Sequence, residues 1–417
     1  MIEAVLVDAV GACVISAGIL SLFVTGELMH RLRGVRVEIT RKFTHVGAGL
    51  IVMSFPWVVQ SPWTVCVLSI AFGALLVAGK YTGLLSSVHG VERRTSGAYY
   101  YPLAVLGTFW LSKGDPLLFC IPIAVMALAD TAAALVGQRV GSTEYQVYDN
   151  HRTVEGSLVF FALAMGICLS GLALAGTPGW PDMLLVAGVA AIMATATEAI
   201  SVRGADNLFI PYTCFLVLDR AMRLGLHDLT GWAEGLLLGV VIVAGSYRVA
   251  ALTPAGSITV LVVVTLAWAL GGWTWLLPLL TFYLLYMATT PRDSTIRADL
   301  DEVFPTIAGS MIVVLIFGHF GDQSLFIPYL ATLSASGAIA LSRMALVRKW
   351  PIIPLAISGA LTPILPVLAY EHDVPVVAIG VAAIAGGVCF AALARSPISG
   401  RRMIASLMAG AVAWAMV

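Results

Sequence analysis

Long apolar runs follow one another along almost the whole chain, and they constrain its fold more than any other feature. The runs are roughly 17–25 residues long, the length that a helix needs to cross a bilayer, and short polar or Gly/Pro-rich connectors separate them. Only 11% of the residues are charged, whereas a soluble domain carries about 25%. The sequence therefore predicts an all-α, polytopic integral membrane protein without a soluble domain.

The expected transmembrane helices number about sixteen, within a range of fourteen to sixteen. They lie at residues 5–29, 43–60, 63–79, 98–112, 116–137, 155–176, 183–200, 207–218, 232–247, 255–270, 273–290, 304–318, 323–342, 351–369, 374–394 and 402–417. We group them into a first membrane domain (1–218), a connector (219–231) and a second membrane domain (232–417).

The basic residues predict the orientation of the chain. If the N-terminus is outside and the connectors alternate, all but three of the 23 basic residues (Lys113, Arg220 and Arg223) fall on the inside, as the positive-inside rule requires. The longest polar connectors of the first half, 30–42, 80–97 and 138–154, then share the cytoplasmic side. We expect an active site at that face of the first eight spans.

Charge and cysteine content exclude some classes of function. The 23 basic residues balance 23 acidic ones, so no net field points to a nucleic acid or an acidic partner. The six cysteines lie inside apolar runs without the spacing of metal ligands, which indicates small hydrophobic residues and neither disulfides nor a zinc site.

Asp130 is the residue whose insertion into the membrane costs the most free energy. It lies about 12 Å inside the fifth span at 1.5 Å per residue. A stripe of small residues at helical spacing (Ala134, Gly137 and Gly141) comes after it, and such a stripe lets a ligand or another helix approach closely. Other polar residues meet Asp130 at the same face from distant parts of the sequence: Arg41, Lys42, His45, Arg93, Arg94, Gly97, Arg152, Thr153, Glu155, Gly156, Ser157, Glu198, Arg203, Asp206 and Asn207.

This combination of residues is typical of a phosphoryl- or nucleotidyl-transfer site. Carboxylates without Cys or His clusters suit Mg²⁺, which prefers oxygen ligands and keeps substrate phosphates as partners. Arginines and helix N-termini suit phosphate oxygens. Simpler explanations exist for single residues: Glu155 is an ordinary first-turn acid, Lys42 a topology anchor, and Asp206-Asn207 a helix cap. For Asp130 the alternative is a structural salt bridge to an arginine.

The ordered motifs resemble the membrane polyprenol-kinase family, which includes phytol kinase and dolichol kinase and is related to phosphatidate cytidylyltransferase. "ADTAAALVGQRVG…HRTVEGS" is similar to the family signature, although Arg152 stands where the family usually has Lys. "RKFTH", "RRTSGAYYYP" and "EAISVRGADNLFIP" resemble three further segments in the same order. The resemblance runs from about residue 38 to 218.

The resemblance implies transfer of the γ-phosphoryl group of a nucleoside triphosphate, often CTP, to a long-chain isoprenoid alcohol. Mg²⁺ is then expected on Asp130 and Asp206, with Asn207 and either Glu155 or Glu198 assisting. Phosphates are expected on a set of basic and small residues, namely Lys42, Arg94, Gly137, Gly141, Arg152, Gly156 and Ser157. Either His45 or a carboxylate takes the proton of the alcohol.

The second half carries another eight candidate spans but not the charged motifs. Aligning residues 332–343 with 127–138 places Ala335 at the position of Asp130. "LTPAGSITVLVVVTLAWALGGWTW" weakly resembles the opening of the phytyl-phosphate kinase family. A duplicated or fused architecture with one degenerate half, and a chance similarity, both remain open. The acids of the connector 293–302 indicate a solvated loop.

Three other functions are compatible with the sequence. A cytidylyltransferase that forms a CDP-lipid can use the same acids and arginines, and it differs in releasing pyrophosphate. A transporter or flippase also combines many spans with intramembrane acids, although here the acids gather at one leaflet and not at the midplane. A catalytically inactive binding scaffold is the third class.

Overall fold

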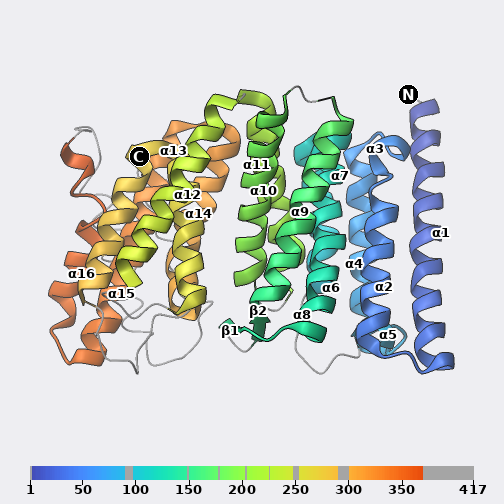
Figure 1. Cartoon of the computed structure of the whole chain (residues 1–417), viewed down its shortest axis with the longest axis horizontal. Helices are drawn as coiled ribbons and strands as arrows, with labels where there is room; N and C mark the ends of the chain where they lie inside the picture. Colours follow the sequence, from blue (N-terminus) through green and yellow to red (C-terminus); the bar gives the residue numbers. More distant parts are fainter. Residues whose placement is uncertain are drawn as a thin grey trace. The chain divides into compact units, whose positions relative to one another are not determined.

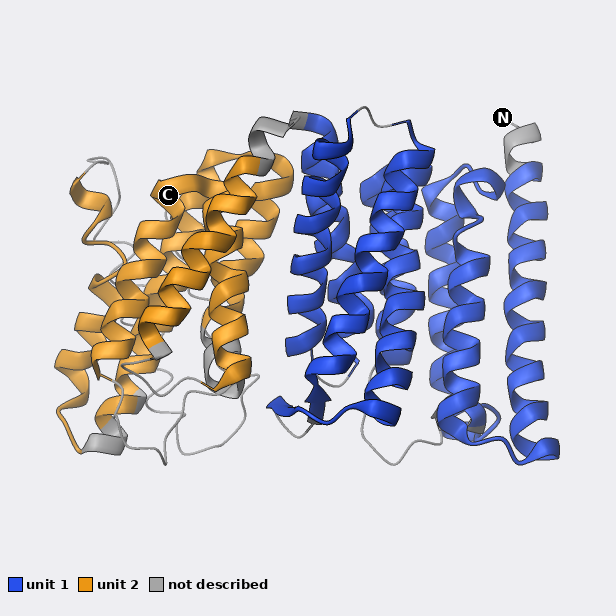
Figure 2. Cartoon of the chain, in the orientation of Figure 1, with its two compact units in different colours: residues 1–226 blue, residues 227–417 orange. Residues whose placement is uncertain are grey.

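The computed structural model describes residues 2–89, 97–147, 150–176, 179–201, 204–224, 226–247, 253–289 and 300–369. The chain divides into two compact units, residues 1–226 and 227–417 (Figure 2). The predicted connector 219–231 falls on the end of helix α11 (Asp206–Leu224) and the start of α12 (Leu226–Tyr247), so helices occupy nearly all of it.

Unit 1 is built from helices that run back and forth between two ends (Figure 1). Its elements, in chain order, are α1 Ile2–Arg33, α2 Val37–Val52, α3 Phe55–Val58, α4 Pro62–Thr82, α5 Ser86–His89, α6 Gly97–Ser112, α7 Pro116–Ala124, the π-helix η1 Val125–Ala129, α8 Asp130–Val140, β1 Glu144–Val147, β2 Asn150–Thr153, α9 Val154–Leu174, α10 Trp180–Ile200 and α11. The all-α prediction therefore misses one two-stranded sheet.

The count of about sixteen spans is not supported. Within the described residues, seven helices are long and apolar enough to cross a membrane: Leu6–Arg33, Pro62–Thr82, Pro116–Val140, Val154–Leu174, Trp180–Ile200, Pro254–Thr289 and Gln323–Ser342. The expected span 43–60 is split between α2, only 16 residues long, and α3. The expected spans 374–394 and 402–417 lie outside the described residues.

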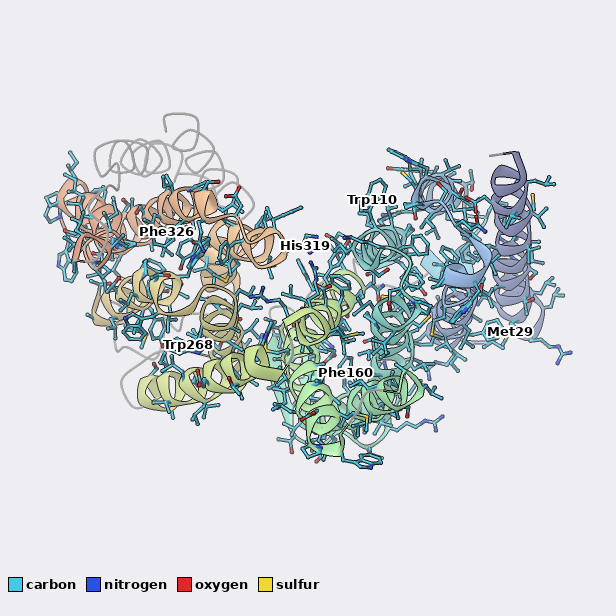
Figure 3. All side chains as sticks on the ribbon, turned by 90° about the horizontal axis from the view of Figure 1, so that it is seen from above. Met29, Trp110, Phe160, Trp268, His319 and Phe326 are labelled. Carbon is cyan, nitrogen blue, oxygen red and sulfur yellow. The ribbon has the colours of Figure 1, made fainter. Side chains whose placement is uncertain are left out.

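The surface of unit 1 is that of a membrane protein. Exposed apolar side chains, Trp110 among them, project from its helices (Figure 3). Trp57, Trp63 and Trp180 are exposed near the starts of α3, α4 and α10, which share one end of the unit (Figure 1). Arg31 ends α1 at the opposite end. Tryptophan at one rim and arginine at the other is typical of a helix bundle that crosses a bilayer.

The span Pro116–Val140 lies at the centre of unit 1, where α2, α9 and α11 all contact it. It is continuous but irregular, because the π-helix η1 separates α7 from α8 immediately before Asp130. Pro122, inside α7, has no N–H to donate. A π-turn inserts one extra residue and rotates the next part of the helix, and such turns frequently mark functional sites.

The chain returns from α8 to α9 through the β1–β2 hairpin, which pairs Tyr145 with Arg152. Thr153 ends β2 and caps α9, since its Oγ1 accepts a hydrogen bond from Gly156 N at 3.1 Å. Helices α8 and α9 then cross closely. A Cβ at Gly137 would lie 2.7 Å from Thr153 Oγ1, and one at Gly156 would lie 3.1 Å from Ala133 O. The small-residue stripe therefore serves the approach of a neighbouring helix.

Unit 2 contains α12, α13 (Pro254–Thr289), α14 (Leu300–Phe320), the 3₁₀ turns η2 (Gln323–Leu325) and η3 (Val367–Ala369), α15 (Phe326–Arg348) and α16 (Ile352–Leu361). The long run α13 is interrupted at Gly272, whose φ of 66° is not helical, and this break separates the two expected spans 255–270 and 273–290. Trp275 stacks on Phe317 with ring centroids 4.2 Å apart and forms the core of the unit. Asp293 and Asp299, in the acid-rich connector, lie outside the described residues.

One buried carboxylate fastens α1 to the start of α4. Asp8 is 7% exposed and accepts hydrogen bonds from Gln60 N (2.7 Å), Ser61 N (3.0 Å) and Thr64 Oγ1 (2.8 Å). Three donors satisfy the carboxylate at the point where the chain turns between spans. The loop 59–61 therefore depends on a side chain that lies more than fifty residues earlier.

We expect the substitution Asp8→Ala to destabilise the protein by about 1–3 kcal/mol, because the N–H groups of Gln60 and Ser61 and the Thr64 hydroxyl all lose their common acceptor. Asp8→Asn keeps one acceptor oxygen and should recover part of the loss. Thermal unfolding in detergent measures both variants. The control Val7→Ala changes an exposed neighbour on the same helix, and equal melting temperatures for it and Asp8→Ala would contradict the role of the carboxylate.

Candidate active site

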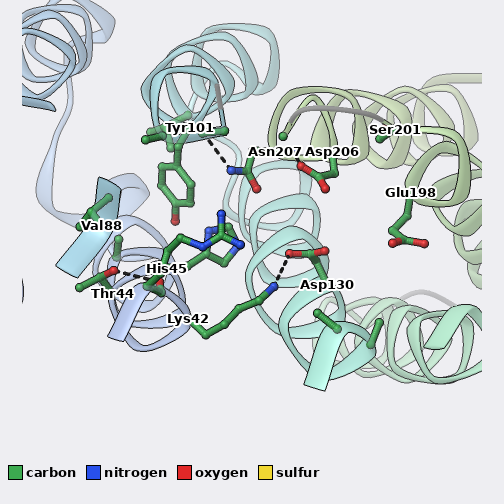
Figure 4. A pocket seen from close by; sticks show the side chains of 18 of the residues that line it. Lys42, Thr44, His45, Val88, Tyr101, Asp130, Glu198, Ser201, Asp206 and Asn207 are labelled. Carbon is green, nitrogen blue, oxygen red and sulfur yellow. Dashed lines mark hydrogen bonds and ion pairs between the residues drawn. The ribbon is translucent and has the colours of Figure 1, made fainter. Parts of the chain in front are cut away.

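A cavity of about 460 Å³ opens within unit 1, and most of the residues predicted for the site line it. They come from α2, α8, β2, the start of α9, the end of α10 and the start of α11 (Figure 4). The predicted residues on its wall are Lys42, His45, Asp130, Gly137, Gly141, Arg152, Gly156, Ser157, Glu198, Asp206 and Asn207. Arg94 lies outside the described residues, as does Arg203.

Asp130 and Lys42 form a buried ion pair inside this cavity. Lys42 Nζ donates to Asp130 Oδ2 at 3.2 Å, and the two residues are 9% and 8% exposed (Figure 4). The partner of Asp130 is thus a lysine of α2 and not an arginine. A carboxylate without a partner at this depth costs free energy. The ion pair offsets the cost of burying the two charges. It also keeps both charges at a ligand-accessible wall.

Arg152 holds a second group of carboxylates that line the same cavity. Its guanidinium contacts the Glu198 carboxylate, lies 3.5 Å from Asp206 Oδ2 and donates to Ser201 O at 2.9 Å. The Glu198 side chain is only 5% exposed. Strand β2, the end of α10 and the start of α11 therefore meet at a single guanidinium. Arginine can do this because its planar fork offers five donors.

Arg41 differs from these two bases in having an uncommitted donor. Its Nη2 donates to Glu38 Oε1 at 3.0 Å on the same helix. Its Nε is buried and has no hydrogen-bond partner among the described residues. Since Arg41 also lines the cavity, this guanidinium is suited to receive an anion.

His45 and Tyr101 lie beside each other, one turn of α2 beyond Lys42. Their rings pack edge to face with centroids 5.3 Å apart. His45 Nε2 lies 3.2 Å from Met126 O, in the π-helix. A carbonyl oxygen only accepts, so this hydrogen bond assigns the proton of the neutral ring to Nε2 and leaves Nδ1 as an acceptor.

Several predicted residues have other partners in the structure, among them Ser157, whose Oγ lies 2.9 Å from the Tyr145 hydroxyl. Glu155 does not line the cavity, because its carboxylate accepts from Ser142 Oγ (2.5 Å) and Thr143 N (3.1 Å) and holds the turn before β1. The amide of Gly156 already donates to Thr153. Asn207 Nδ2 donates to Gly97 O at 3.0 Å and joins α11 to α6.

The described residues contain no group of three His, Cys, Asp or Glu side chains close enough to hold a metal ion by themselves. The cavity does present oxygen ligands, since the carboxylates of Asp130, Glu198 and Asp206 all face it (Figure 4). Mg²⁺ commonly uses one or two carboxylates together with substrate phosphates and waters. The carboxylates therefore fit a Mg²⁺ ion only if further oxygen ligands come from outside the protein.

Sequence reasoning misses two parts of the cavity. Tyr101 belongs to the segment "AYYYP" but is not among the predicted site residues, and that motif is the signal that could have found it. The cavity also extends past His45 along an apolar wall that includes Val52, Phe55 and Leu68. Nothing in the sequence distinguishes these side chains from ordinary core residues.

The Arg152–Glu198 pair predicts an asymmetric response to mutation. Arg152→Ala leaves a carboxylate buried without its partner and should destabilise the protein by about 3–5 kcal/mol. The double substitution Arg152→Ala with Glu198→Gln removes that charge and should recover much of the loss. Thermal unfolding of the two variants in detergent tests this.

The control for this pair is Arg31→Ala. Arg31 pairs with Glu27 one turn away on α1, but the Arg31 side chain is 54% exposed and Glu27 keeps the hydrogen bond from Ser87 N, so Arg31→Ala should cost much less than Arg152→Ala. A double variant no more stable than Arg152→Ala alone would contradict the pairing of Arg152 with Glu198.

Comparison with known proteins agrees with this geometry. The chain matches no family model and no solved structure. It is 33% identical over 201 residues to a protein of Synechocystis sp. named phytol kinase, and the match covers 47% of this chain and 85% of that protein. Identity of this level over most of the relative's length shows common ancestry. The chain therefore belongs to the phytol kinase family.

Proposed function

We propose that this protein transfers the γ-phosphoryl group of a nucleoside triphosphate to an isoprenoid alcohol, with CTP as the preferred donor. The observation that carries the proposal is the cavity of unit 1. It brings the ion pairs of Asp130 and Arg152 together on its walls, in a chain that is one third identical to a phytol kinase over the matched residues. A charged end for phosphates and an apolar extension for a lipid match the two substrates of such a kinase.

The ion pairs suggest how the nucleotide binds. Lys42 and Arg152 are held by carboxylates, and Arg41 has a free Nε donor. A triphosphate offers these three bases stronger anionic partners, so we propose that it takes over Lys42 and Arg152. Asp130 and Asp206 are then released to hold Mg²⁺ with the phosphates. Bound there, Mg²⁺ would neutralise charge that develops on the phosphate oxygens.

The transfer step needs a group that accepts the proton of the alcohol. We assign this role to Nδ1 of His45, because the hydrogen bond from Nε2 to Met126 O fixes the ring and its tautomer. The alcohol oxygen forms the new bond to the γ-phosphorus, and the bond from that phosphorus to the β–γ bridging oxygen breaks. The proton moves to His45, and the nucleoside diphosphate leaves.

The proposed orientation places this chemistry at the cytoplasmic leaflet, with the N-terminus outside. The support is the position of Arg31 and Arg139 in the last turns of α1 and α8, at the end of unit 1 opposite the exposed tryptophans (Figure 1). The cytoplasmic side is also where nucleoside triphosphates are available. The positive-inside rule gives the same orientation.

We expect Asp130→Asn to lower phosphoryl transfer by at least about 100-fold, because the amide neither balances Lys42 nor binds Mg²⁺ well. The assay offers γ-labelled CTP or ATP with Mg²⁺ and phytol, geranylgeraniol, a long polyprenol or diacylglycerol to purified protein in detergent. Asp182→Asn, at the far end of α10, is the matched control and should keep full activity.

Three results of this assay would overturn the proposal. Undiminished transfer by Asp130→Asn would remove that residue from the mechanism. Release of pyrophosphate in place of a nucleoside diphosphate would identify a cytidylyltransferase. If no acceptor gives labelled lipid, the ion pairs serve transport or binding and not phosphoryl transfer.

We expect His45→Gln to reduce kcat by roughly 10²–10⁴-fold, the usual contribution of a positioned base, with little change in the KM for the nucleotide. Glutamine can still donate to Met126 O but cannot accept the proton. Steady-state kinetics with the best acceptor measure kcat and the KM for the nucleotide separately. A variant with normal kcat would assign the proton transfer to a carboxylate.

A further inference from the structure

The cavity of unit 1 has two chemically different parts. One part holds the ion pairs described above. The other, which we call the apolar arm, continues between α1, α2, α4 and α6 and is lined by Phe23, Ala48, Val52, Phe55, Leu68 and Phe72 with a few further apolar neighbours. A single cavity therefore joins a charged end to a hydrocarbon-like end.

Helix α2 shows the change of character most clearly. Arg41, His45, Ala48 and Val52 follow one helical face, and all four line the cavity. The first two are polar and the last two apolar. At 1.5 Å per residue, the arm extends about 10 Å from the level of His45 to that of Val52, toward the membrane interior and away from the basic end.

Tyr101 lies where the two parts meet. It points into the cavity beside His45 (Figure 4), and its hydroxyl is buried without a hydrogen-bond partner among the described residues. A buried hydroxyl left unpaired costs about 1–3 kcal/mol. A ligand hydroxyl at this point would satisfy it and would also lie next to the ring of His45.

Phe55 closes the far end of the arm, and two further aromatic rings pack against it. Phe55 forms its end wall and is 3% exposed. Its ring stacks on Phe119 with centroids 6.2 Å apart and packs edge to face on Phe109 at 6.3 Å. Phe109 and Phe119 also contact each other at 5.3 Å. The end wall is therefore held in place by a rigid aromatic cluster.

We propose that the apolar arm binds the hydrocarbon tail of the isoprenoid alcohol and that Phe55 sets the longest tail that fits. Tyr101 positions the alcohol hydroxyl near His45. This inference rests on the proposed function for the identity of the ligand. The arm is unsuited to a nucleobase, because a base needs several polar partners and this wall is almost entirely apolar.

The first test compares acceptors of increasing length: geraniol, farnesol, geranylgeraniol and a long polyprenol. We expect Ala48→Phe, which narrows the arm only one turn beyond His45, to lower kcat/KM by about 10-fold or more for every acceptor of this series, because each tail must pass this point. Phe55→Ala should move the preferred acceptor to a longer alcohol, and the milder Phe55→Leu should act in the same direction if the alanine variant does not fold.

Leu50→Phe is the matched control for Ala48→Phe. It adds a ring to the same helix at a position that is 54% exposed and does not line the cavity. Its acceptor profile should equal that of the unsubstituted protein. Equal kcat/KM values for Ala48→Phe and Leu50→Phe would overturn the proposal, as would an unchanged length preference in Phe55→Ala and Phe55→Leu.

A second test does not depend on catalysis. A geranylgeraniol analogue with a photoreactive group at the tail end should label peptides of α2–α3, α4 and α6, and Ala48→Phe should suppress the labelling while Leu50→Phe should not. Labelling confined to other helices would overturn the tail site. Specific labelling without phosphoryl transfer would keep the tail site and reject the proposed kinase activity.

Discussion

Charge pairing in a low-dielectric interior is the constraint on which the rest of unit 1 depends. Asp130, Glu198 and Asp206 all lie where an unpaired carboxylate would be unstable, so each needs a base from another part of the chain. Lys42 arrives from α2 and Arg152 from β2. The hairpin, the π-helix before Asp130 and the close crossing of α8 and α9 are the features that bring these bases within reach.

Most of the charged side chains of the site are carried by helices and not by loops. Lys42 and Asp130 both lie inside helices, and Glu198 is in the last turn of α10. Side chains on packed helices keep their positions better than side chains on connectors. The hairpin is the exception, and Glu155 secures it by accepting hydrogen bonds from Ser142 and Thr143. An acid expected at the metal therefore has a structural role beside the site.

Most of the charged residues that line the cavity were among those predicted from the sequence, whereas the span count, the hairpin and the apolar arm were not predicted, for physical reasons. A carboxylate inside an apolar run costs so much free energy that it must have a partner or a function. Asp130 could therefore be identified from the sequence. Span counting failed because apolar runs such as 43–60 contain a break that hydropathy does not register. The hairpin was missed because two four-residue strands leave almost no pattern. The apolar arm could not be found because Ala48, Val52 and Phe55 have the composition of any core.

In the proposed reaction, the apolar arm determines how tightly the lipid tail binds, and the charged end determines how readily the product leaves. For the proposed reaction, the hydrocarbon tail is the same before and after transfer, so its burial stabilises both complexes equally and cannot drive turnover. Only the head changes, from a neutral hydroxyl to a phosphate surrounded by Arg41, Lys42 and Arg152. The carboxylates of Asp130, Glu198 and Asp206 compete for two of these bases. In the proposed reaction these carboxylates would compete with the product phosphate, so re-formation of the ion pairs would favour release of the phosphorylated lipid.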